Sequence, residues 1–406
     1  MGDVRALERN LRVLRFMQLA AGMQLFVPVF FLFLRSNGLG WQEVFVIEAV
    51  FIFAGMAFQI PVGAIVDRVG RKPVLVGGFL AGAAGFAVYG STGTLPWFVV
   101  AEILLAFYVT CHVIGLEAMT HATLAGVGRE HEYRRTMGEL QCNSMWTMAV
   151  ASVLGGLAAC WSLRLTVWLS VPAMVACAAF ALRLTEPGAR EVHSLSLLRV
   201  WKDALFGRPA LRAVVLVNAA FATSTMALAW FTQPYQAAMG TPFWVIGGVG
   251  ATALLLSALV SRFVPYLERF VDDRLLLLTI LVTVTGCLAG MALTGGVIGI
   301  VLLLVGRACF GALVVGNDLL HKLVEPGTRG RVIAVQGCLT RAVMGGGCFG
   351  FGTLLEGQGL TAALWTIAGF ASVMMTGSFL LLLRHWAPLP ETIEDVVVEV
   401  EMETQH

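Results

Sequence analysis

Charged residues are scarce in this chain: Asp, Glu, Lys and Arg make up 13% of its 406 residues, whereas 58% are hydrophobic. Ordinary soluble domains carry about 25% charged residues. A water-soluble fold could not hide so much apolar surface, so we expect lipid to be the solvent for most of the chain. The net charge of +2 gives no indication of nucleic-acid binding.

Several chemical signatures are also missing. The eight cysteines fall in apolar stretches and none forms a C-x-x-C pair, so we expect small buried thiols rather than disulfides or a metal site. The P-loop pattern G-x-x-x-x-G-K-[ST] is absent, and no nucleophile–base pair or metal cluster has a suitable spacing. The sequence therefore predicts neither an enzyme nor a resident cofactor or metal.

Apolar segments long enough to cross a bilayer, about 20 residues each, are abundant instead. We expect an all-α integral membrane protein with twelve spanning helices, the seventh of them interrupted near Pro234. The segments run over 14–34, 43–66, 73–91, 95–118, 137–160, 165–182, 211–236, 243–264, 275–293, 297–318, 331–354 and 361–383.

Basic residues are distributed unevenly between the two sides of this plan. Of the 27 Lys and Arg residues, 23 fall at or beyond the span ends on the side of the N-terminus, two (Arg35 and Arg164) on the opposite side, and two (Arg307 and Arg341) at mid-span. Because Lys and Arg are enriched in cytoplasmic loops, we expect both termini to be cytoplasmic, in a multi-pass protein of the cell (inner) membrane. A missed span would invert every later loop, so the asymmetry also supports the count of twelve.

The longest internal loop divides the spans into two sets of six, as in many transporters built from internal repeats. We expect an N-terminal bundle over residues 1–182 and a C-terminal bundle over 211–384, related by pseudo-symmetry. The linker over 183–210 has leucines at near-helical spacing with basic residues between them, which predicts a short amphipathic helix on the inner interface. Residues 385–406 read as an acidic disordered tail.

The loop between the second and third spans carries the most specific motif, GAIVDRVGRKPV. It resembles the signature G-x-x-x-D-R-x-G-R-[KR] of the major facilitator superfamily, at the same position in the same twelve-span plan. With the topology, the resemblance covers almost the whole chain and implies a drug-efflux-like transporter with that family's fold. The matching residues are Gly63, Asp67, Arg68, Gly70, Arg71 and Lys72.

The resemblance also implies a conformational latch on the cytoplasmic side. In it, Asp67 and Arg71 interact with an acid at the end of the fourth span, a position that Glu117 matches, and with the start of the eleventh span. The latch would stabilise the outward-open state and break when the halves rock. From the residues themselves, Gly63 permits close approach of a neighbouring helix and Gly70 allows a tight turn. The alternative is a loop that only fixes topology.

Four charged residues lie deep within the expected spans, away from their ends: Glu48, Glu102, Arg307 and Arg341. Each would cost about 2.5–3.5 kcal/mol at the bilayer centre, so we expect them to face a hydrated cavity or one another. A glutamate that gains and loses an arginine partner as the cavity opens and closes would bind and release a proton. We therefore predict that these four form the coupling set, the alternative being fixed ion pairs that hold the bundle together.

The resemblance places spans one, four, seven and ten around a central cavity, and polar and aromatic residues occur in two of them. The candidates for lining a substrate site are Gln18, Gln24, Asn218, Trp230, Gln233 and Tyr235.

The function expected from these observations is secondary active transport of a small amphipathic or zwitterionic molecule by alternating access, as a proton-coupled exporter (an antiporter) that works as a monomer. A translocator of lipids or lipid-linked headgroups and a proton-coupled importer of a metabolite remain alternatives with the same fold. A membrane sensor or membrane-embedded enzyme is disfavoured, because neither a signalling domain nor a catalytic cluster is found.

Overall fold

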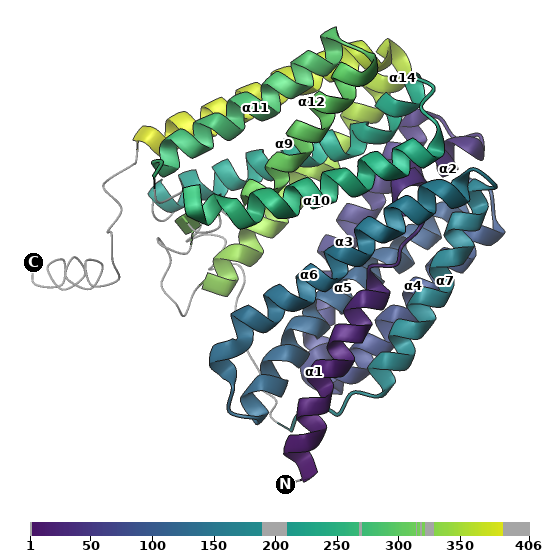
Figure 1. The fold of residues 1–406 in the computed structure, drawn as a ribbon, viewed down its shortest axis with the longest axis vertical. Helices are drawn as coiled ribbons and strands as arrows, with labels where there is room; N and C mark the ends of the chain where they lie inside the picture. Colours follow the sequence, from purple (N-terminus) through teal and green to yellow (C-terminus); the bar gives the residue numbers. More distant parts are fainter. Residues whose placement is uncertain are drawn as a thin grey trace, which may run out of the picture.

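The computed structural model describes residues 2–188, 209–267, 270–313, 315–316, 319–320 and 329–384. The predicted acidic tail and nearly all of the predicted interfacial helix lie outside these residues. Every regular element in the described part is helical (Figure 1). The elements are α1 (Gly2–Ala21), η1 (Val27–Val29), α2 (Phe30–Ser36), α3 (Trp41–Val69), α4 (Arg71–Ser91), α5 (Leu95–Gly126), η2 (Glu130–Glu132), α6 (Tyr133–Ala159), α7 (Leu163–Leu182), α9 (Pro209–Ala238), α10 (Phe243–Leu267), α11 (Asp273–Leu293), α12 (Gly296–Ala308), η3 (Cys309–Ala312) and α14 (Arg329–Arg384).

These helices account for the twelve predicted spans. Nine stretches of the described residues are long and apolar enough to cross a membrane, and the last of them runs through two spans that are broken at Gly359. The shorter apolar helices Val27–Ser36 and Gly296–Ala312 complete the first and tenth spans. Gly359 has φ +79°, a left-handed conformation that glycine adopts at little cost. The predicted span count is confirmed.

The helices form two bundles of six spans, as predicted (Figure 1). Helices α1 to α7 pack with one another, and α9 to α14 pack with one another. The bundles touch mainly through two helix pairs, α3 with α14 and α6 with α10.

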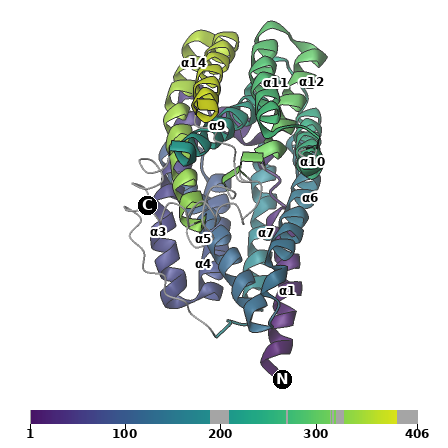
Figure 2. The same ribbon diagram turned by 90° about the vertical axis from the view of Figure 1, so that its left-hand side faces the viewer.

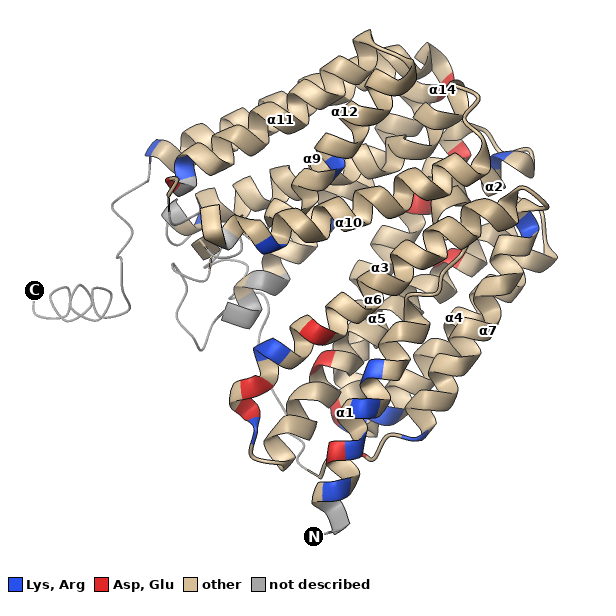
Figure 3. Cartoon of the chain, in the orientation of Figure 1, with Lys and Arg blue, Asp and Glu red and all other residues tan. Residues whose placement is uncertain are grey.

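Figures 1 and 2 show the bundles meeting near α2 and spreading apart toward the N-terminus. We call the first end the Gly40 end, because α3 begins there after Gly40, and the other the Gly70 end, because α3 ends there at Gly70. Most of the charged residues in Figure 3 lie at the Gly70 end or in the connections, and few lie within the bundles.

The interruption predicted for span seven occurs in span one instead. Helix α9 continues through Pro234 to Ala238, whereas α1 ends at Ala21 and helical structure resumes only at Val27. Pro28 lies in η1, directly after this break, and proline cannot donate the backbone hydrogen bond that a helix running on from α1 would require. The neighbouring backbone groups of the break are paired with side chains of other helices, described below.

Glycines bring the two bundles into backbone contact. A Cβ placed on Gly247 of α10 would lie 2.8 Å from the Cα of Gly156 of α6, closer than side-chain atoms can approach. The hydroxyl of Ser152 donates a hydrogen bond of 2.9 Å to the carbonyl of Gly247 across the same contact. Small residues therefore set the closest approach of α6 and α10.

This contact can be tested with two neighbouring glycines. We expect Gly247→Leu to force α6 and α10 apart and to lower the population of the conformation seen here at least tenfold, because the new side chain would meet the backbone of α6. Gly248→Leu is the matched control, since a Cβ at Gly248 meets no atom within 4 Å. Double electron–electron resonance between spin labels at Thr94 and Gln358, one on each bundle near the Gly40 end, measures the distance between the bundles. Equal distance distributions for the two variants would contradict the assignment.

Candidate functional site

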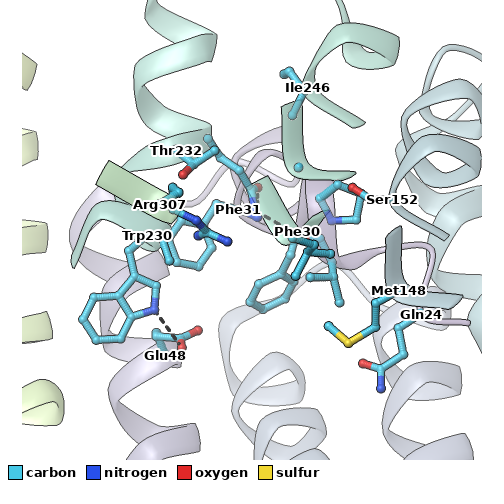
Figure 4. Close-up of a pocket in the computed structure, with 16 residues that line it drawn as sticks. Gln24, Phe30, Phe31, Glu48, Met148, Ser152, Trp230, Thr232, Ile246 and Arg307 are labelled. Carbon is cyan, nitrogen blue, oxygen red and sulfur yellow. Dashed lines mark hydrogen bonds between the residues drawn. The ribbon is translucent and has the colours of Figure 1, made fainter. Parts of the chain in front are cut away.

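A cavity of about 270 Å³ lies between the two bundles (Figure 4). Both bundles line it. The N-terminal bundle contributes α3, α6 and the segment that follows α1, and the C-terminal bundle contributes α9, α10 and α12. Its walls are mainly apolar and aromatic, with a few polar groups. The polar and aromatic lining residues are Gln24, Phe30, Phe31, Glu48, Ser152, Trp230, Thr232, Gln233 and Arg307.

Two of the four charged residues predicted to couple transport line this cavity. Glu48 comes from α3 and Arg307 from α12, so the two charges belong to different bundles. Both lie on the side of the cavity where Trp230 lies, opposite Gln24 and Met148 (Figure 4). The Nε1–H of Trp230 donates a hydrogen bond of 3.0 Å to the Glu48 carboxylate. This bond joins the two bundles, and among the described residues Arg307 has no ion-pair partner.

The other two charged residues lie elsewhere. Glu102 is 3% exposed within the N-terminal bundle and accepts a hydrogen bond of 2.6 Å from the hydroxyl of Tyr89. Arg341 of α14 is half-buried and does not line the cavity. The structure thus brings together one acid and one base of the predicted set of four.

Gln18 of α1 and Gln24 in the break that follows α1 both make polar contacts with α5. The side-chain amide of Gln24 faces the cavity and donates to the Tyr108 hydroxyl at 3.3 Å. Gln18 is buried, and its Oε1 lies 2.6 Å from the Nε2 of His112, whose ring stacks on Tyr108. Gln24 is therefore a cavity residue, whereas Gln18 lies behind it within the bundle.

Gln233 of α9 pairs with the break in span one. Its Oε1 accepts a hydrogen bond of 2.8 Å from the backbone N–H of Phe31, and its Nε2 donates at 3.1 Å to the carbonyl of Val27. Within the N-terminal bundle, the hydroxyl of Ser170 accepts from the N–H of Leu25 at 3.1 Å. Gln233 lines the cavity and also pairs with the backbone of the opposite bundle.

Asn218 and Tyr235 occupy packing positions away from the cavity. Asn218 is 1% exposed and donates to the carbonyl of Gly316 at 2.8 Å. Tyr235 is 2% exposed, and its hydroxyl donates to the carbonyl of Thr294 at 3.0 Å. Both hold α9 against the tenth span or its flanking turn rather than lining the site.

Other lining residues were not among the candidates. Ser152, Met148 and Thr232 are short or flexible side chains of ordinary apolar-rich helices. A sequence pattern does not distinguish them from packing residues, because only the register of α6 and α9 turns them toward the cavity. Pro28 was identifiable as a helix breaker, and its position beside Gln24 could have indicated an irregular cavity wall.

The segment 67–72 around Gly70, called the Gly70 loop below, makes a different ion pair from the one the family resemblance implies. The guanidinium of Arg71 lies 3.5 Å from Glu186, just after α7. Asp67 and Glu117 have no ion pair among the described residues, and Glu117 is exposed. Gly70 has φ +112°, as expected for a tight turn. A Cβ at Gly63 would meet no atom within 4 Å, so the close helix approach expected there is absent in this conformation.

Glu356 of α14 closes the Gly40 end. Its carboxylate accepts a hydrogen bond from the backbone N–H of Trp41, the first residue of α3. Glu43 of α3 accepts from the N–H of Gly40 at 2.8 Å. A carboxylate is stabilised at a helix N-terminus by the free N–H groups and the helix dipole. Glu43 belongs to α3 itself, whereas Glu356 belongs to the opposite bundle.

Two pseudo-symmetric bundles of apolar helices, with a partly polar cavity lined by both, define a membrane transporter of the two-bundle type. The description of the matching family model reads Major Facilitator Superfamily, and the match covers residues 14–350. The chain belongs to this superfamily, and it is a transporter rather than an enzyme.

Among curated proteins, the chain is 31% identical over 98 residues to the inner membrane transport protein YajR of Escherichia coli (strain K12). The match covers 24% of this chain and 20% of YajR.

Two solved transporters share the fold at low identity. A point mutant of the nucleoside transporter NupG matches with a TM-score of 0.76 and 14% identity, over 92% of this chain and 99% of NupG. A bacterial homologue of the human lysosomal transporter Spinster, in an inward-facing and unoccupied conformation, matches with a TM-score of 0.73 and 12% identity, over 94% of this chain and 99% of that one.

Glu356→Gln tests the closure of the Gly40 end. The Gln side chain keeps an oxygen acceptor but loses the charge, which should weaken the interaction with the N-terminus of α3 by about 1 kcal/mol. This change corresponds to an about fivefold shift in the ratio of closed to open Gly40 ends. We expect the Gly40 end to open correspondingly more often, measured with the same Thr94 and Gln358 labels.

Glu43→Gln is the matched control, because Glu43 caps α3 from within the same helix and keeps its partner whichever way the bundles move. Equal opening in both variants would show that the inter-bundle contact of Glu356 does not hold this end closed.

Proposed function

We propose that the chain is a secondary active transporter that moves a small amphipathic or zwitterionic molecule by alternating access. The observation that carries this proposal is that Glu48 and Arg307, from different bundles, line one cavity. Ligand pockets have volumes of about 300 to 1,000 Å³, and this cavity of about 270 Å³ lies just below that range, so the substrate would be a small molecule. Residues 1–182 and 211–384 would be the two moving units, joined by the linker over 183–210, and the monomer would be the functional form.

The substrate class follows from the lining. Opposite charges on the two bundles would bind the cationic and anionic ends of a zwitterion, and Trp230, Phe30 and Phe31 offer aromatic surface for an apolar part. Glu48 and Arg307 each lose water when a substrate fills the cavity, and this loss must be offset by pairing with a substrate charge. A ligand that carries only one charge would leave one of these two side chains unpaired. Strongly anionic compounds are therefore disfavoured.

We propose that the Gly70 end faces the cytoplasm, with both termini on that side, in the inner membrane. The concentration of Lys and Arg in the connections at that end supports this orientation (Figure 3). The contacts of Glu356, Gln233 and Trp230 would then close the periplasmic side, so that the conformation is inward-facing. The inward-facing state described for the Spinster homologue supports the same assignment.

The coupling ion would be a proton, carried by Glu48. In this conformation the carboxylate accepts a hydrogen bond from Trp230, a bond that joins the bundles at 3.0 Å. Rocking of the bundles would break this bond and change the distance from Glu48 to Arg307, and an acid whose partners change in this way changes its affinity for a proton. Exchange of a proton for the substrate at this site would drive export.

Glu48→Gln and Glu102→Gln separate the two candidate carriers. We expect Glu48→Gln to lower pH-gradient-driven transport in proteoliposomes at least a hundredfold, because the neutral amide neither binds a proton nor pairs with the cationic end of the substrate. The sequence hypothesis assigns the same loss to Glu102→Gln. The contact of Glu102 with Tyr89 inside one bundle instead favours a loss of less than tenfold.

The assay needs a substrate screen in proteoliposomes with an imposed pH gradient of either direction. Export is supported if substrate moves against the proton flux, and import if both move together. Movement of a fluorescent lipid without proton flux would favour the lipid translocator instead. Full gradient-driven transport by Glu48→Gln would remove Glu48 from the mechanism.

We also propose that the Gly70 loop holds the opposite, outward-facing state, in which Asp67 and Arg71 meet Glu117 and the start of span eleven. Asp67 has no ion pair among the described residues of the present conformation, so Asp67→Asn should leave this state intact and weaken the other.

We expect an increase of about fivefold in the inward-facing population of Asp67→Asn, from a loss of about 1 kcal/mol. The Thr94 and Gln358 labels again report it. Glu132→Gln, which breaks only local contacts of Glu132 with Arg129 at 2.6 Å and His131 at 3.8 Å, is the control. An unchanged distribution in Asp67→Asn would reduce the loop to a topological role.

A further inference from the structure

A second cavity, of about 810 Å³, lies at the Gly70 end of the N-terminal bundle. It is formed by α1, the start of α4 and the end of α7, and it takes no part in the site between the bundles. Four of its lining residues are cations: Arg9, Arg12, Lys72 and Arg183. The one acid that lines it is Glu186.

Glu186 does not neutralise these four cations. Its carboxylate accepts hydrogen bonds from the backbone N–H groups of Arg71 at 3.0 Å and of Lys72 at 2.8 Å, and it pairs with the Arg71 guanidinium. It is therefore held at the N-terminus of α4. Within the described part of the chain, Arg9, Arg12, Arg183 and the ammonium of Lys72 have no ion pair. Like charges gathered around one cavity repel each other, which favours a bound anion.

Apolar side chains adjoin the cations on the same helices. Phe16 is 56% exposed and Leu182 is 59% exposed, and the Phe16 ring stacks on Phe180 with centroids 6.1 Å apart. Residues Arg9, Arg12 and Phe16 lie at helical spacings that share one face of α1. At a rise of 1.5 Å per residue, Phe16 lies about 6 Å further along the span than Arg12. Phe16 and Phe180 therefore lie deeper along their helices than the cations Arg12 and Arg183, whereas Leu182 lies at the end of α7 beside Arg183.

We propose that this cavity binds an anionic phospholipid. Arg9, Arg12, Lys72 and Arg183 would bind its phosphate group, and an acyl chain would lie along Phe16 and Leu182. Charge complementarity explains the phosphate, and the two exposed apolar side chains, Phe16 about one turn deeper than Arg12 and Leu182 at the end of α7, explain the acyl chain, because a free phosphate would leave them uncovered. Because Lys72 belongs to the Gly70 loop, the bound lipid would also lie against that loop.

Native mass spectrometry of the full-length protein in detergent tests the proposal. Equal concentrations of phosphatidylglycerol and phosphatidylcholine are added, and bound lipids are counted as collision energy rises. We expect one phosphatidylglycerol to bind at least tenfold more tightly than phosphatidylcholine, and this preference to be lost in the double variant Arg12→Gln with Arg183→Gln.

The matched control is the double variant Arg134→Gln with Arg384→Gln. Both residues are exposed cations that do not line the cavity, so the control removes the same charge elsewhere and should keep the preference. An equal loss in the two double variants would overturn the proposal, since it would show attraction by net charge alone. Equal binding of the two lipids by the unmodified protein would overturn it too.

Two further arms separate a lipid from a free anion. Leu182→Ser should weaken phosphatidylglycerol binding about threefold without altering the charge. Glycerol phosphate should compete only at concentrations at least a hundredfold higher than the lipid, and competition at equal concentration would identify a soluble anion site instead. On the unmodified protein, a photoreactive phosphatidylglycerol should crosslink to peptides of α1 and α7, and crosslinks confined to other helices would refute the location.

Discussion

The pairing of polar groups in a medium without water is the constraint on which the rest of this structure depends. An unpaired backbone N–H or C=O in the bilayer core costs several kcal/mol, so a helix can break there only where other groups replace its hydrogen bonds. The break in span one meets this condition through Ser170 on one side and Gln233 on the other. The same rule directs Glu48 and Arg307 into the cavity between the bundles.

The rule also links local structure to conformational change. Ser170 belongs to the same bundle as the break, so its bond to Leu25 would persist in the proposed rocking of the bundles. Gln233 belongs to the other bundle, and in that movement its two bonds to Val27 and Phe31 would have to be given up or replaced by water. Wetting of the cavity and separation of the bundles would therefore be coupled at this position. A substrate with hydrogen-bonding groups would compete for the same backbone atoms.

The sequence predicted the features that depend on composition and on the free energy of placing charged side chains in lipid. Twelve spans follow from the lengths of the apolar segments, and Glu48 and Arg307 were identified because ionised side chains are costly in lipid. The parts that depend on distant partners were less predictable. Asn218 and Tyr235 lie in span seven like Gln233, but helix register turns them toward Gly316 and Thr294. Glu356 follows an apolar span near a turn, and only the approach of α3 gives it a partner.

The glycine contacts have a mechanical consequence. On one flank, Gly247 and Gly156 bring α10 against α6, and on the other a Cβ at Gly352 of α14 would lie 2.9 Å from the Cα of Gln42 of α3. Backbones that touch without intervening side chains have few rotamers to rearrange, so they can roll over one another with little repacking. The line through these two contacts would then be the rotation axis that requires the least side-chain repacking. Rotation of the bundles about it would widen the opening at one end of the molecule and narrow the opening at the other.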